Sequence, residues 1–238
     1  MKIALASAPF ENNNIPYNLS QLEQFARRAA RMGAQLVCFG ETFVQGFDSL
    51  CWKYEQDSEV ALSLSSPTMQ KLCQLSDEVG IDLLFGYIER EDDRLYSSCA
   101  LIQDGKILQN YRRLSRGWKE FRITDEHYCE GDVAQPFLYR GRRCLIALCG
   151  DLWDLPERFD CGEEILFWPV YVNFKQADWQ DSVRASYIQQ AAKIPCDVLL
   201  INSLSKNPDA FGGCYHFRGG TVLDTLEYGN EGLLIVEL

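Results

Sequence analysis

The stretch Cys144-Leu145-Ile146-Ala147-Leu148-Cys149-Gly150-Asp151-Leu152-Trp153 combines a buried strand with an abrupt turn. Its first five residues have the length and apolar content of a buried strand, and Cys149 follows at the carboxyl end. Because open α/β sheets bind ligands beyond the carboxyl ends of their strands, a thiol there is well placed to act as a nucleophile. Gly150 allows a tight turn and leaves the following backbone N–H groups unshielded for an oxyanion. The alternative interpretation is a small buried apolar residue, as most free cysteines are.

Predicted strands and helices alternate on both sides of this stretch. Strands are predicted at residues 2–7, 36–39, 82–88, 95–102, 106–112, 144–148, 165–172, 198–202, 219–224 and 233–236. Helices are predicted from an N-cap at Asn18 to a stop at Gly33, and over residues 67–79 and 177–193. No segment resembles an interdomain linker, so residues 1–238 are expected to form a single domain of mixed α/β sheets with helices outside.

Composition predicts an ordinary globular protein, with 47% hydrophobic and 24% charged residues. The net charge of −11 argues against nucleic acid or an anionic membrane as a partner. No apolar stretch approaches the roughly 20 residues that span a bilayer, and residues 1–6 are too short for a signal peptide. The 10 cysteines form no CxxC pair, which predicts reduced thiols and a cytoplasmic location. With 2 histidines and no paired ligand spacing, no metal site is expected.

Glu41 is the second candidate for chemistry, because it follows the predicted strand 36–39 and a glycine. A carboxylate in a dry pocket beside a thiol would have a raised pKa and could act as a base and then as an acid. The alternative is a solvated loop acid or a charge at a helix N-terminus. His216 could be the base of a papain-like pair, although a strand-edge side chain in a ligand or dimer contact is favoured. The Gly-x-Cys-x-Gly elbow of class I glutaminases is absent, because Ala147 and Asp151 occupy its glycine positions.

Five blocks, in the right order, resemble the nitrilase or carbon–nitrogen hydrolase superfamily over nearly the whole chain. Residues 40–43 (GETF) resemble the P-E-x-F block around the catalytic glutamate, and residues 148–153 (LCGDLW) resemble I-C-Y-D-x-R, which carries the nucleophile. Residues 184–191 resemble the R-A-x-E-N helix, 200–203 the asparagine-bearing strand and 216–224 the closing hairpin. The resemblance implies a four-layer α-β-β-α sandwich of two mixed sheets with outer helices, commonly paired into homodimers.

The family's third catalytic residue is a lysine in a Y-R-K-x-H-L segment, and here the sequence departs from the pattern. Residues 111–120 read YRRLSRGWKE, so the direct register places Arg113 at the lysine. An arginine could hold an oxyanion, but it is bulkier and cannot give up a proton. Lys119 is therefore the predicted working lysine, since a compact ammonium can approach a thiol closely, and Arg113 is the alternative. We expect the Lys119 ammonium to contact both Cys149 and Glu41.

The resemblance implies a hydrolase that cleaves a non-peptide carbon–nitrogen bond of a small amide or N-carbamoyl compound. Cys149 would form a thioester with the acyl group, Glu41 would move the protons, the lysine and Gly150 would hold the oxyanion, and water would release the acid. No metal or organic cofactor is required. Glu126, in a shortened counterpart of the family's E-x-x-x-F-x-P-G block, is predicted to support the lysine. Predicted substrate contacts are Phe43, Gly150, Trp153 and Asn173. The alternative is a catalytically impaired protein of this fold that binds a small ligand or acts in regulation.

Overall fold

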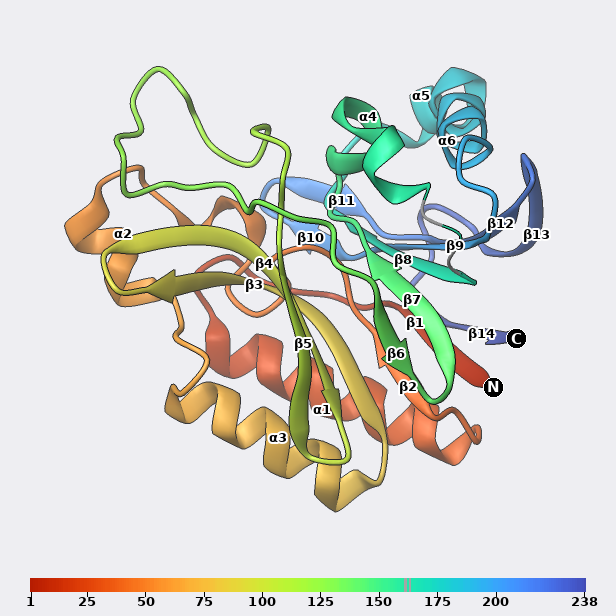
Figure 1. The fold of residues 1–238 in the computed structure, drawn as a ribbon, viewed down its shortest axis with the longest axis horizontal. Coiled ribbons are helices and arrows are strands. Elements are labelled where there is room, and N and C mark those ends of the chain that lie inside the picture. The colour runs from red at the N-terminus through yellow and green to blue at the C-terminus, as the bar shows by residue number, and fades with distance from the viewer. Residues whose placement is uncertain (161, 163) are drawn as a thin grey trace.

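Two mixed sheets pack face to face in the computed structural model, which describes residues 1–160, 162 and 164–238 (Figure 1). The first sheet contains, in spatial order, β14 (Gly232–Glu237), β1 (Lys2–Ser7), β2 (Leu36–Cys38), β3 (Asp82–Glu91), β4 (Arg94–Gln103) and β5 (Lys106–Arg112). The second contains β13 (Thr221–Leu226), β12 (Cys214–Arg218), β9 (Asp197–Asn202), β8 (Ile165–Val170), β7 (Arg142–Ile146) and β6 (Phe137–Tyr139). A small hairpin of β10 (Leu204–Lys206) and β11 (Asp209–Phe211) lies apart from both.

Each sheet has a parallel centre and antiparallel flanks. Strands β1, β2 and β3 run parallel in the first sheet, as do β7, β8 and β9 in the second. The remaining ladders are antiparallel, and β14 brings the C-terminus beside β1, where the Met1 ammonium donates to the Leu238 carbonyl. Glu41 follows β2 and Cys149 follows β7, so each sheet contributes one candidate residue just beyond a central parallel strand.

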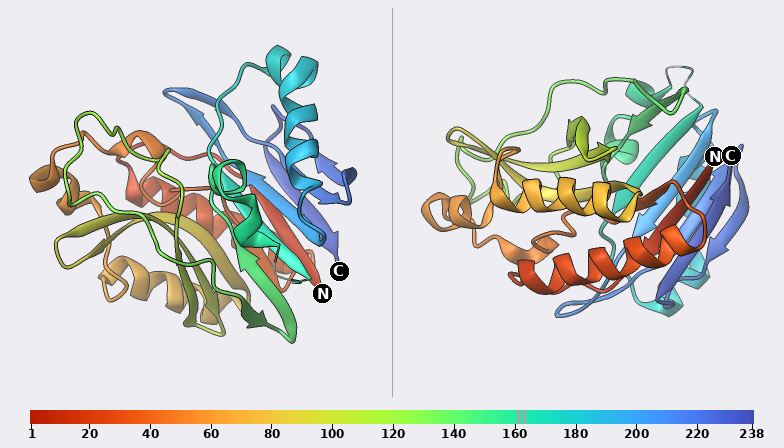
Figure 2. Two further views of the ribbon diagram at one scale, coloured as in Figure 1. Left: turned by 45° about the horizontal axis from the view of Figure 1, so that its top comes forward. Right: turned by 90° about the horizontal axis from the view of Figure 1, so that it is seen from below.

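Helices cover the outer faces of both sheets, which confirms the predicted four-layer α-β-β-α sandwich (Figure 2). Helices α1 (Ile15–Arg31) and α3 (Pro67–Val79) lie on the first sheet, and α4 (Asp151–Asp154), α5 (Gln176–Asp178) and α6 (Arg184–Ala191) lie by the second. A further helix, α2 (Tyr54–Val60), follows a short 3₁₀ turn at Phe47–Ser49, and another such turn spans Pro156–Phe159. None of the helices within the described residues is long and apolar enough to cross a membrane.

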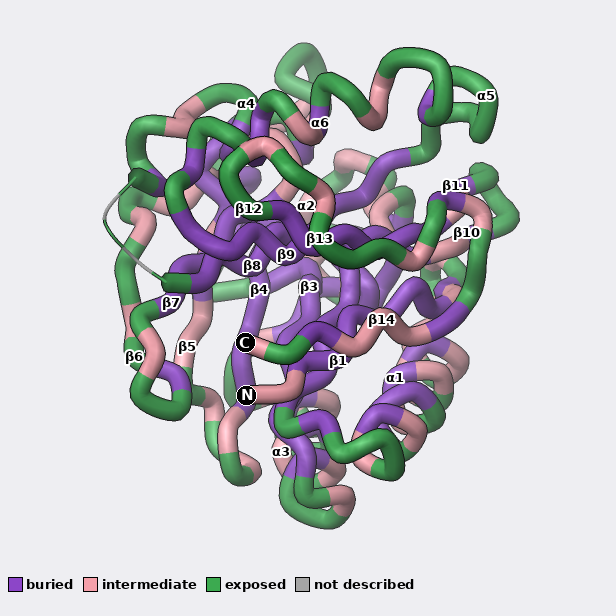
Figure 3. The backbone as a smooth tube through the Cα atoms, turned by 90° about the vertical axis from the view of Figure 1, so that its right-hand side faces the viewer, coloured by how far each residue is buried: buried purple, intermediate pink, exposed green. Residues whose placement is uncertain are grey.

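Strand periodicity separates two layers of core. In β1, Ile3 and Leu5 face the second sheet, whereas Ala4 and Ala6 face the outer helices, because side chains alternate along a strand. The small alanines let α1 pack closely, and all four residues are fully buried. Figure 3 shows that central strands such as β8 and β9 are buried along their length, and that exposed residues gather on the outer turns and helices.

Two predictions of local structure, the N-cap of the first helix and the helix over residues 177–193, require correction. The N-cap of α1 is Asn14, whose side chain accepts the Tyr17 N–H at 3.2 Å, because Pro16 fits the first turn and starts the helix early. Asn18 is instead buried inside the helix, where it bonds the backbone of Glu11 and Val44. The helix predicted over residues 177–193 is interrupted by a π-helical turn at Trp179–Val183.

The strand β12 was missed as a separate element, and β7 ends earlier than predicted. The predicted strand 219–224 overlaps β13, while β12 precedes it as the other half of a hairpin. Strand β7 ends at Ile146, although its hydrogen bonding to the next strand continues through single bonds from the Ala147 and Cys149 N–H groups to the Phe167 and Pro169 carbonyls. The chain therefore reaches Cys149 in an extended path before it turns.

The side chain of Asn202, at the end of β9, joins this strand to two other segments, at Val172 and at Gly212. Its side chain donates to the Val172 and Gly212 carbonyls at 3.0 Å each and accepts the Val172 N–H at 3.1 Å. It is 1% exposed, so water cannot replace these bonds.

Replacing Asn202 by leucine should therefore destabilise the fold, because buried backbone groups lose their partner. We expect the free energy of unfolding in urea to fall by roughly 2–4 kcal/mol, the cost of leaving such groups unpaired. Asn12→Ala, which removes two exposed hydrogen bonds, to the Asn207 carbonyl and from the Asp48 N–H, is the control and should lower stability by no more than about 1 kcal/mol. Equal stabilities of the two variants would show that the Asn202 bonds contribute nothing.

Candidate active site

Glu41 is carried on a turn that touches both sheets. The Glu41 N–H donates to the Val170 carbonyl at the end of β8, at 3.3 Å, and the Gly86 N–H on β3 donates to the Gly40 carbonyl at 3.2 Å. A Cβ atom on Gly86 would stand 2.4 Å from the Thr42 nitrogen, so only glycine lets β3 approach the turn this closely. The carboxylate is thereby directed between the sheets, and Glu41 is 1% exposed.

Cys149 occupies a strained backbone conformation at the turn after β7. Its φ is +39°, in the left-handed region that residues with a Cβ atom rarely adopt. The Cys149 N–H donates to the Pro169 carbonyl at 3.0 Å, and the Trp168 indole N–H donates to the Cys149 carbonyl at 2.9 Å. The thiol points to the Tyr171 carbonyl at 3.7 Å. These bonds to the neighbouring strand hold the strained residue in place.

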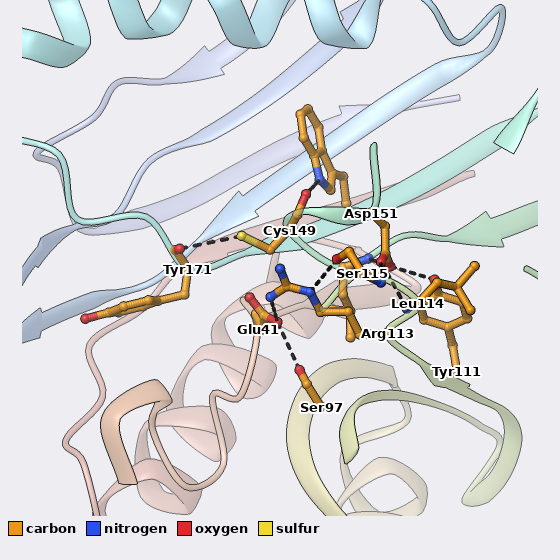
Figure 4. Close-up of polar contacts among 11 residues, drawn as sticks. Glu41, Ser97, Tyr111, Arg113, Leu114, Ser115, Cys149, Asp151 and Tyr171 are labelled. Atoms are coloured by element: carbon orange, nitrogen blue, oxygen red, sulfur yellow. Dashed lines mark hydrogen bonds and ion pairs between the residues drawn. The ribbon is translucent and has the colours of Figure 1, made fainter. Parts of the chain in front are cut away.

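A buried ion pair faces this thiol. The Arg113 Nη1 donates to Glu41 Oε1 at 2.8 Å, and Arg113 is 3% exposed. The Ser97 hydroxyl donates to the same carboxylate oxygen at 2.9 Å, and the Arg113 Nε donates to the Ser115 hydroxyl at 2.7 Å. Figure 4 shows the Glu41–Arg113 pair beside Cys149, whose sulfur is directed toward the Tyr171 carbonyl. The other carboxylate oxygen, Oε2, is buried and has no hydrogen-bond partner among the described residues.

The Asp151 carboxylate joins the segment that contains Arg113 to the turn that contains Cys149. Its carboxylate accepts the N–H groups of Leu114 and Ser115 at 3.0 and 2.7 Å and that of Leu148 at 2.8 Å. The Tyr111 hydroxyl donates to it at 2.6 Å (Figure 4). Because Tyr111 lies on β5 and Leu148 follows β7, one buried carboxylate joins the two sheets beside the site. Arg113 is thereby placed within the same few residues as the Asp151 anchor.

Burial and charge set the protonation of the site. Burial, followed by the charge of Glu41, raises the pKa of the Cys149 thiol to about 12, although Arg113 lowers it. Burial by itself would lower the pKa of Arg113, but Glu41, Cys149 and Asp151 raise it above the ordinary value, so the guanidinium stays charged. At neutral pH the site thus holds a protonated thiol beside a permanent cation.

The expectation that Lys119 contacts Cys149 and Glu41 is wrong. The Lys119 ammonium is 2.7 Å from Glu130 Oε1 and bonds the Tyr128 carbonyl, and it lines a hollow of about 200 Å³ with Arg116 and Phe121. The preceding Trp118 is buried against Tyr128 in a small cluster of its own, which turns the loop away from the thiol. The alternative, Arg113, is the cation that the structure brings to Glu41.

Other predicted site residues divide between the site, the core and the surface. Glu126 is exposed, and its carbonyl accepts the Cys129 thiol at 3.2 Å, so its predicted support of Lys119 is wrong: Glu130 pairs with that lysine. Phe43 is fully buried and packs on Phe39 with ring centroids 4.8 Å apart, which makes it a core residue.

Gly150, Trp153 and Asn173 lie on accessible or partly accessible segments, and their substrate contacts stay predictions. Gly150 has φ −67° and ψ −12°, so the positive φ of this turn falls on Cys149 and the predicted need for glycine flexibility is wrong. Trp153 is 38% exposed and packs edge-on against Tyr187, with ring centroids 5.0 Å apart. Asn173 is exposed shortly after β8.

Sequence reasoning missed the residues that hold the site together. Each of four such residues, Ser97, Ser115, Tyr111 and Asp151, is at most 3% exposed. Ser97 bonds Glu41 and Ser115 bonds Arg113, whereas Tyr111 bonds the Asp151 carboxylate that holds the backbone on both sides of the site. The signal for Asp151 was present, because a charged residue two places after a buried strand and its cysteine needs a partner. His216 is not available as a base in a papain-like pair, since its two ring nitrogens face Asp197 at 2.9 Å and Asp224 at 3.2 Å.

The structure is an α-β-β-α sandwich that holds a thiol, a carboxylate and a cation between the ends of its two sheets. This combination indicates a hydrolase, and comparison with known proteins supports that class. A model of the carbon–nitrogen hydrolase family matches residues 2–154. The glutamine-dependent NAD(+) synthetase of Acinetobacter baylyi is 26% identical over 157 residues, which are 65% of this chain and 28% of that protein. An (R)-stereoselective amidase of a Pseudomonas species is 30% identical over 158 residues, which are 66% of this chain and 54% of that one.

A solved structure shows the same fold. The amidase from Nesterenkonia sp. AN1, in a form with acrylamide added at its active-site cysteine, has a TM-score of 0.80 and 19% sequence identity, and the match covers 100% of this chain and 93% of that chain. The chain belongs to the carbon–nitrogen hydrolase family, as its five sequence blocks predicted. It spans 28% and 54% of the lengths of the two curated relatives.

The positions of Arg113 and Lys119 predict that only the replacement of Arg113 by methionine changes the reactivity of Cys149. Arg113→Met should slow alkylation of Cys149 by iodoacetamide at pH 7.5 by about tenfold or more, because it removes the charge that lowers the thiol pKa. Lys119→Met should leave that rate within about twofold. The measurement is the rate of mass gain on the Cys149 peptide. A large loss in Lys119→Met with none in Arg113→Met would restore the original assignment.

Proposed function

We propose that this chain hydrolyses the carbon–nitrogen bond of a small amide or N-carbamoyl compound, with Cys149 as nucleophile, Glu41 as base and acid, and Arg113 as the supporting cation. One observation carries the proposal: a buried Glu41–Arg113 ion pair faces a strained cysteine where the two sheets meet. A buried charge pair is expensive to desolvate, so this one has a use beyond stability. The family membership supports the same reaction class.

Proton transfer to Glu41 begins the proposed reaction. Because the pKa of the Cys149 thiol is about 12, little free thiolate exists near neutral pH, and the proton must leave as the sulfur attacks the carbonyl. Glu41 Oε1 is occupied by Arg113 and Ser97, which leaves the buried Oε2 to accept that proton. The same oxygen then returns the proton to the departing amine, and afterwards takes one from the water that releases the acid.

Arg113 would stabilise the negative charge that develops on the substrate oxygen. Its Nη1 holds Glu41, while Nη2 lies next to Gly150, only 2.5 Å from where a Cβ on that residue would stand. The Gly150 N–H follows the nucleophile directly and is the second proposed donor. Donors of this kind are worth roughly 3 kcal/mol each elsewhere. Arginine is never deprotonated in proteins, so all proton transfer in this mechanism falls to Glu41.

The substrate class rests on the relatives and on the enclosure of the site. One relative is, by its name, an amidase, and the other is, by its name, a synthetase that depends on glutamine, which is itself an amide. Glu41 and Arg113 are 1% and 3% exposed, and such an enclosed carboxylate and cation favour a small substrate. We further propose that the chain acts as one domain in a homodimer, and its cytoplasmic location stays a prediction. The alternative function is small-ligand binding without turnover.

Replacing Cys149 by alanine should abolish hydrolysis while leaving the fold intact, because the change leaves little cavity at a strand end. Ammonia release from a panel of small amides and N-carbamoyl compounds should fall to background. Cys73→Ala, at a partly exposed cysteine on α3, is the control and should keep full activity. Activity of Cys149→Ala above a trace would remove this thiol from the mechanism. A wild-type chain that binds but never cleaves the panel would favour the binding function.

Glu41→Gln should abolish turnover and lower the thiol pKa at the same time. Turnover should fall by at least about 10²-fold, because an amide can neither take the thiol proton nor donate to the leaving group. Glu41 raises the pKa of Cys149, so its neutralisation should move the midpoint of Cys149 alkylation below pH 12, toward the ordinary thiol value. The pH dependence of alkylation and ammonia release measure the two effects. Normal turnover in this variant would make Glu41 structural.

A further inference from the structure

The guanidinium of Arg113 meets a different neighbour at each of its three nitrogens. Nη1 donates to Glu41 at 2.8 Å and Nε donates to the Ser115 hydroxyl at 2.7 Å. Nη2 lies against two glycines: a Cβ atom would stand 2.5 Å from it on Gly150 and 3.1 Å from it on Gly117. A carboxylate, a hydroxyl and the space beside two glycines are therefore matched to the three nitrogens of one planar side chain.

Gly150 is glycine for a steric reason. Its backbone, at φ −67° and ψ −12°, is one that alanine adopts freely, so backbone strain does not require glycine there. Nor can the turn move aside, because the Cys149 and Asp151 N–H groups are bonded to the Pro169 and Leu148 carbonyls. An added methyl would overlap Nη2 and crowd the Ser115 hydroxyl at 3.0 Å. The space left by glycine is the space that the guanidinium fills.

Ser115 fixes the rotation of the same side chain. Its hydroxyl accepts the Nε hydrogen, which a lysine does not possess, and its own N–H is held by Asp151 at 2.7 Å. Ser115 is 2% exposed, so water is a poor substitute as the Nε partner. With Nε and Nη1 both engaged, the plane of the guanidinium is set and Nη2 is directed to the residue after the nucleophile.

We propose that Ser115 and Gly150 are positioning residues that adapt this site to an arginine, so that Arg113, Ser115 and Gly150 act as one exchangeable set. The proposal rests on the proposed function. In the motifs Y-R-K-x-H-L and I-C-Y-D-x-R, the same three positions hold lysine, histidine and tyrosine, so three separate departures in the sequence have one physical explanation. Arg113 is then a fitted replacement for the lysine, with Nη2 as the donor to the oxyanion.

The test is whether the effect of Gly150→Ala depends on Arg113. We would measure the rate of Cys149 alkylation by iodoacetamide at pH 7.5, by mass spectrometry of its peptide, in wild type, Gly150→Ala, Arg113→Lys and the double variant. With Arg113 present, the methyl should displace the cation and slow alkylation by about tenfold, the effect of one pKa unit. In the Arg113→Lys background the same methyl should change the rate by less than about twofold, because no Nη2 is there to displace.

Ser115→Ala is a second variant, which creates no steric clash and tests whether Ser115 sets the orientation of the Arg113 guanidinium. It should shift the pH midpoint of Cys149 alkylation upward, because a rotated guanidinium lowers the thiol pKa less. Ser98→Ala is the matched control, since Ser98 is a fully buried serine bonded to Glu89 of another ion pair. It should leave the midpoint unchanged.

Two results would overturn the proposal: an equal effect of Gly150→Ala in both Arg113 backgrounds, or equal midpoints for Ser115→Ala and wild type. Thermal unfolding of each variant shows whether a lost rate reflects a lost fold. Because alkylation needs no substrate, these results are independent of amide turnover. A chain that releases no ammonia from any amide would refute the proposed function while the coupling of Arg113, Ser115 and Gly150 could still be measured.

Discussion

The Glu41–Arg113 ion pair is the interaction on which the rest of the site depends. Two charges removed from water cost more than their attraction returns unless every donor and acceptor around them is satisfied. Here Ser97 and Ser115 supply those bonds, and Asp151 binds the backbone that carries Arg113. The other oxygen of the Glu41 carboxylate, Oε2, is buried and has no hydrogen-bond partner among the residues described. The packing has therefore satisfied the pair everywhere except where a reaction would use it.

The sandwich fold makes this arrangement possible because it brings together strand ends from two sheets. Glu41 leaves the first sheet after β2 and Cys149 leaves the second after β7. The hydrogen bonds from the Glu41 N–H to the Val170 carbonyl and from the Tyr111 hydroxyl to Asp151 cross between the sheets and fix their relative position there. The apolar layer between the sheets keeps water from the charges, which strengthens their interaction.

An arginine in the place of a lysine changes how the chemistry is divided. A lysine ammonium can change protonation when it is buried, whereas a guanidinium remains charged and offers several directed N–H groups. One guanidinium can thus hold Glu41 through Nη1 while Nη2, in the proposed mechanism, is directed to the substrate. A guanidinium needs more space than an ammonium and a defined orientation. Gly150 leaves the space, and Ser115 sets the orientation.

The sequence by itself determined most of the fold and two of the three central residues. A short apolar run predicted β1, and the turn dipeptide Asp104-Gly105 helped to predict β5, both at their observed bounds. A cysteine and a glutamate soon after buried strands made Cys149 and Glu41 candidates, because these signals are local. Only the tertiary structure decided the cation. Residues 112–122 hold four arginines and one lysine within a short stretch, and no spacing rule says which side chain turns inward. Contacts with other parts of the chain decide it. Asp151 accepts the N–H groups of Leu114 and Ser115, whereas the Lys119 ammonium binds the Tyr128 carbonyl and Glu130.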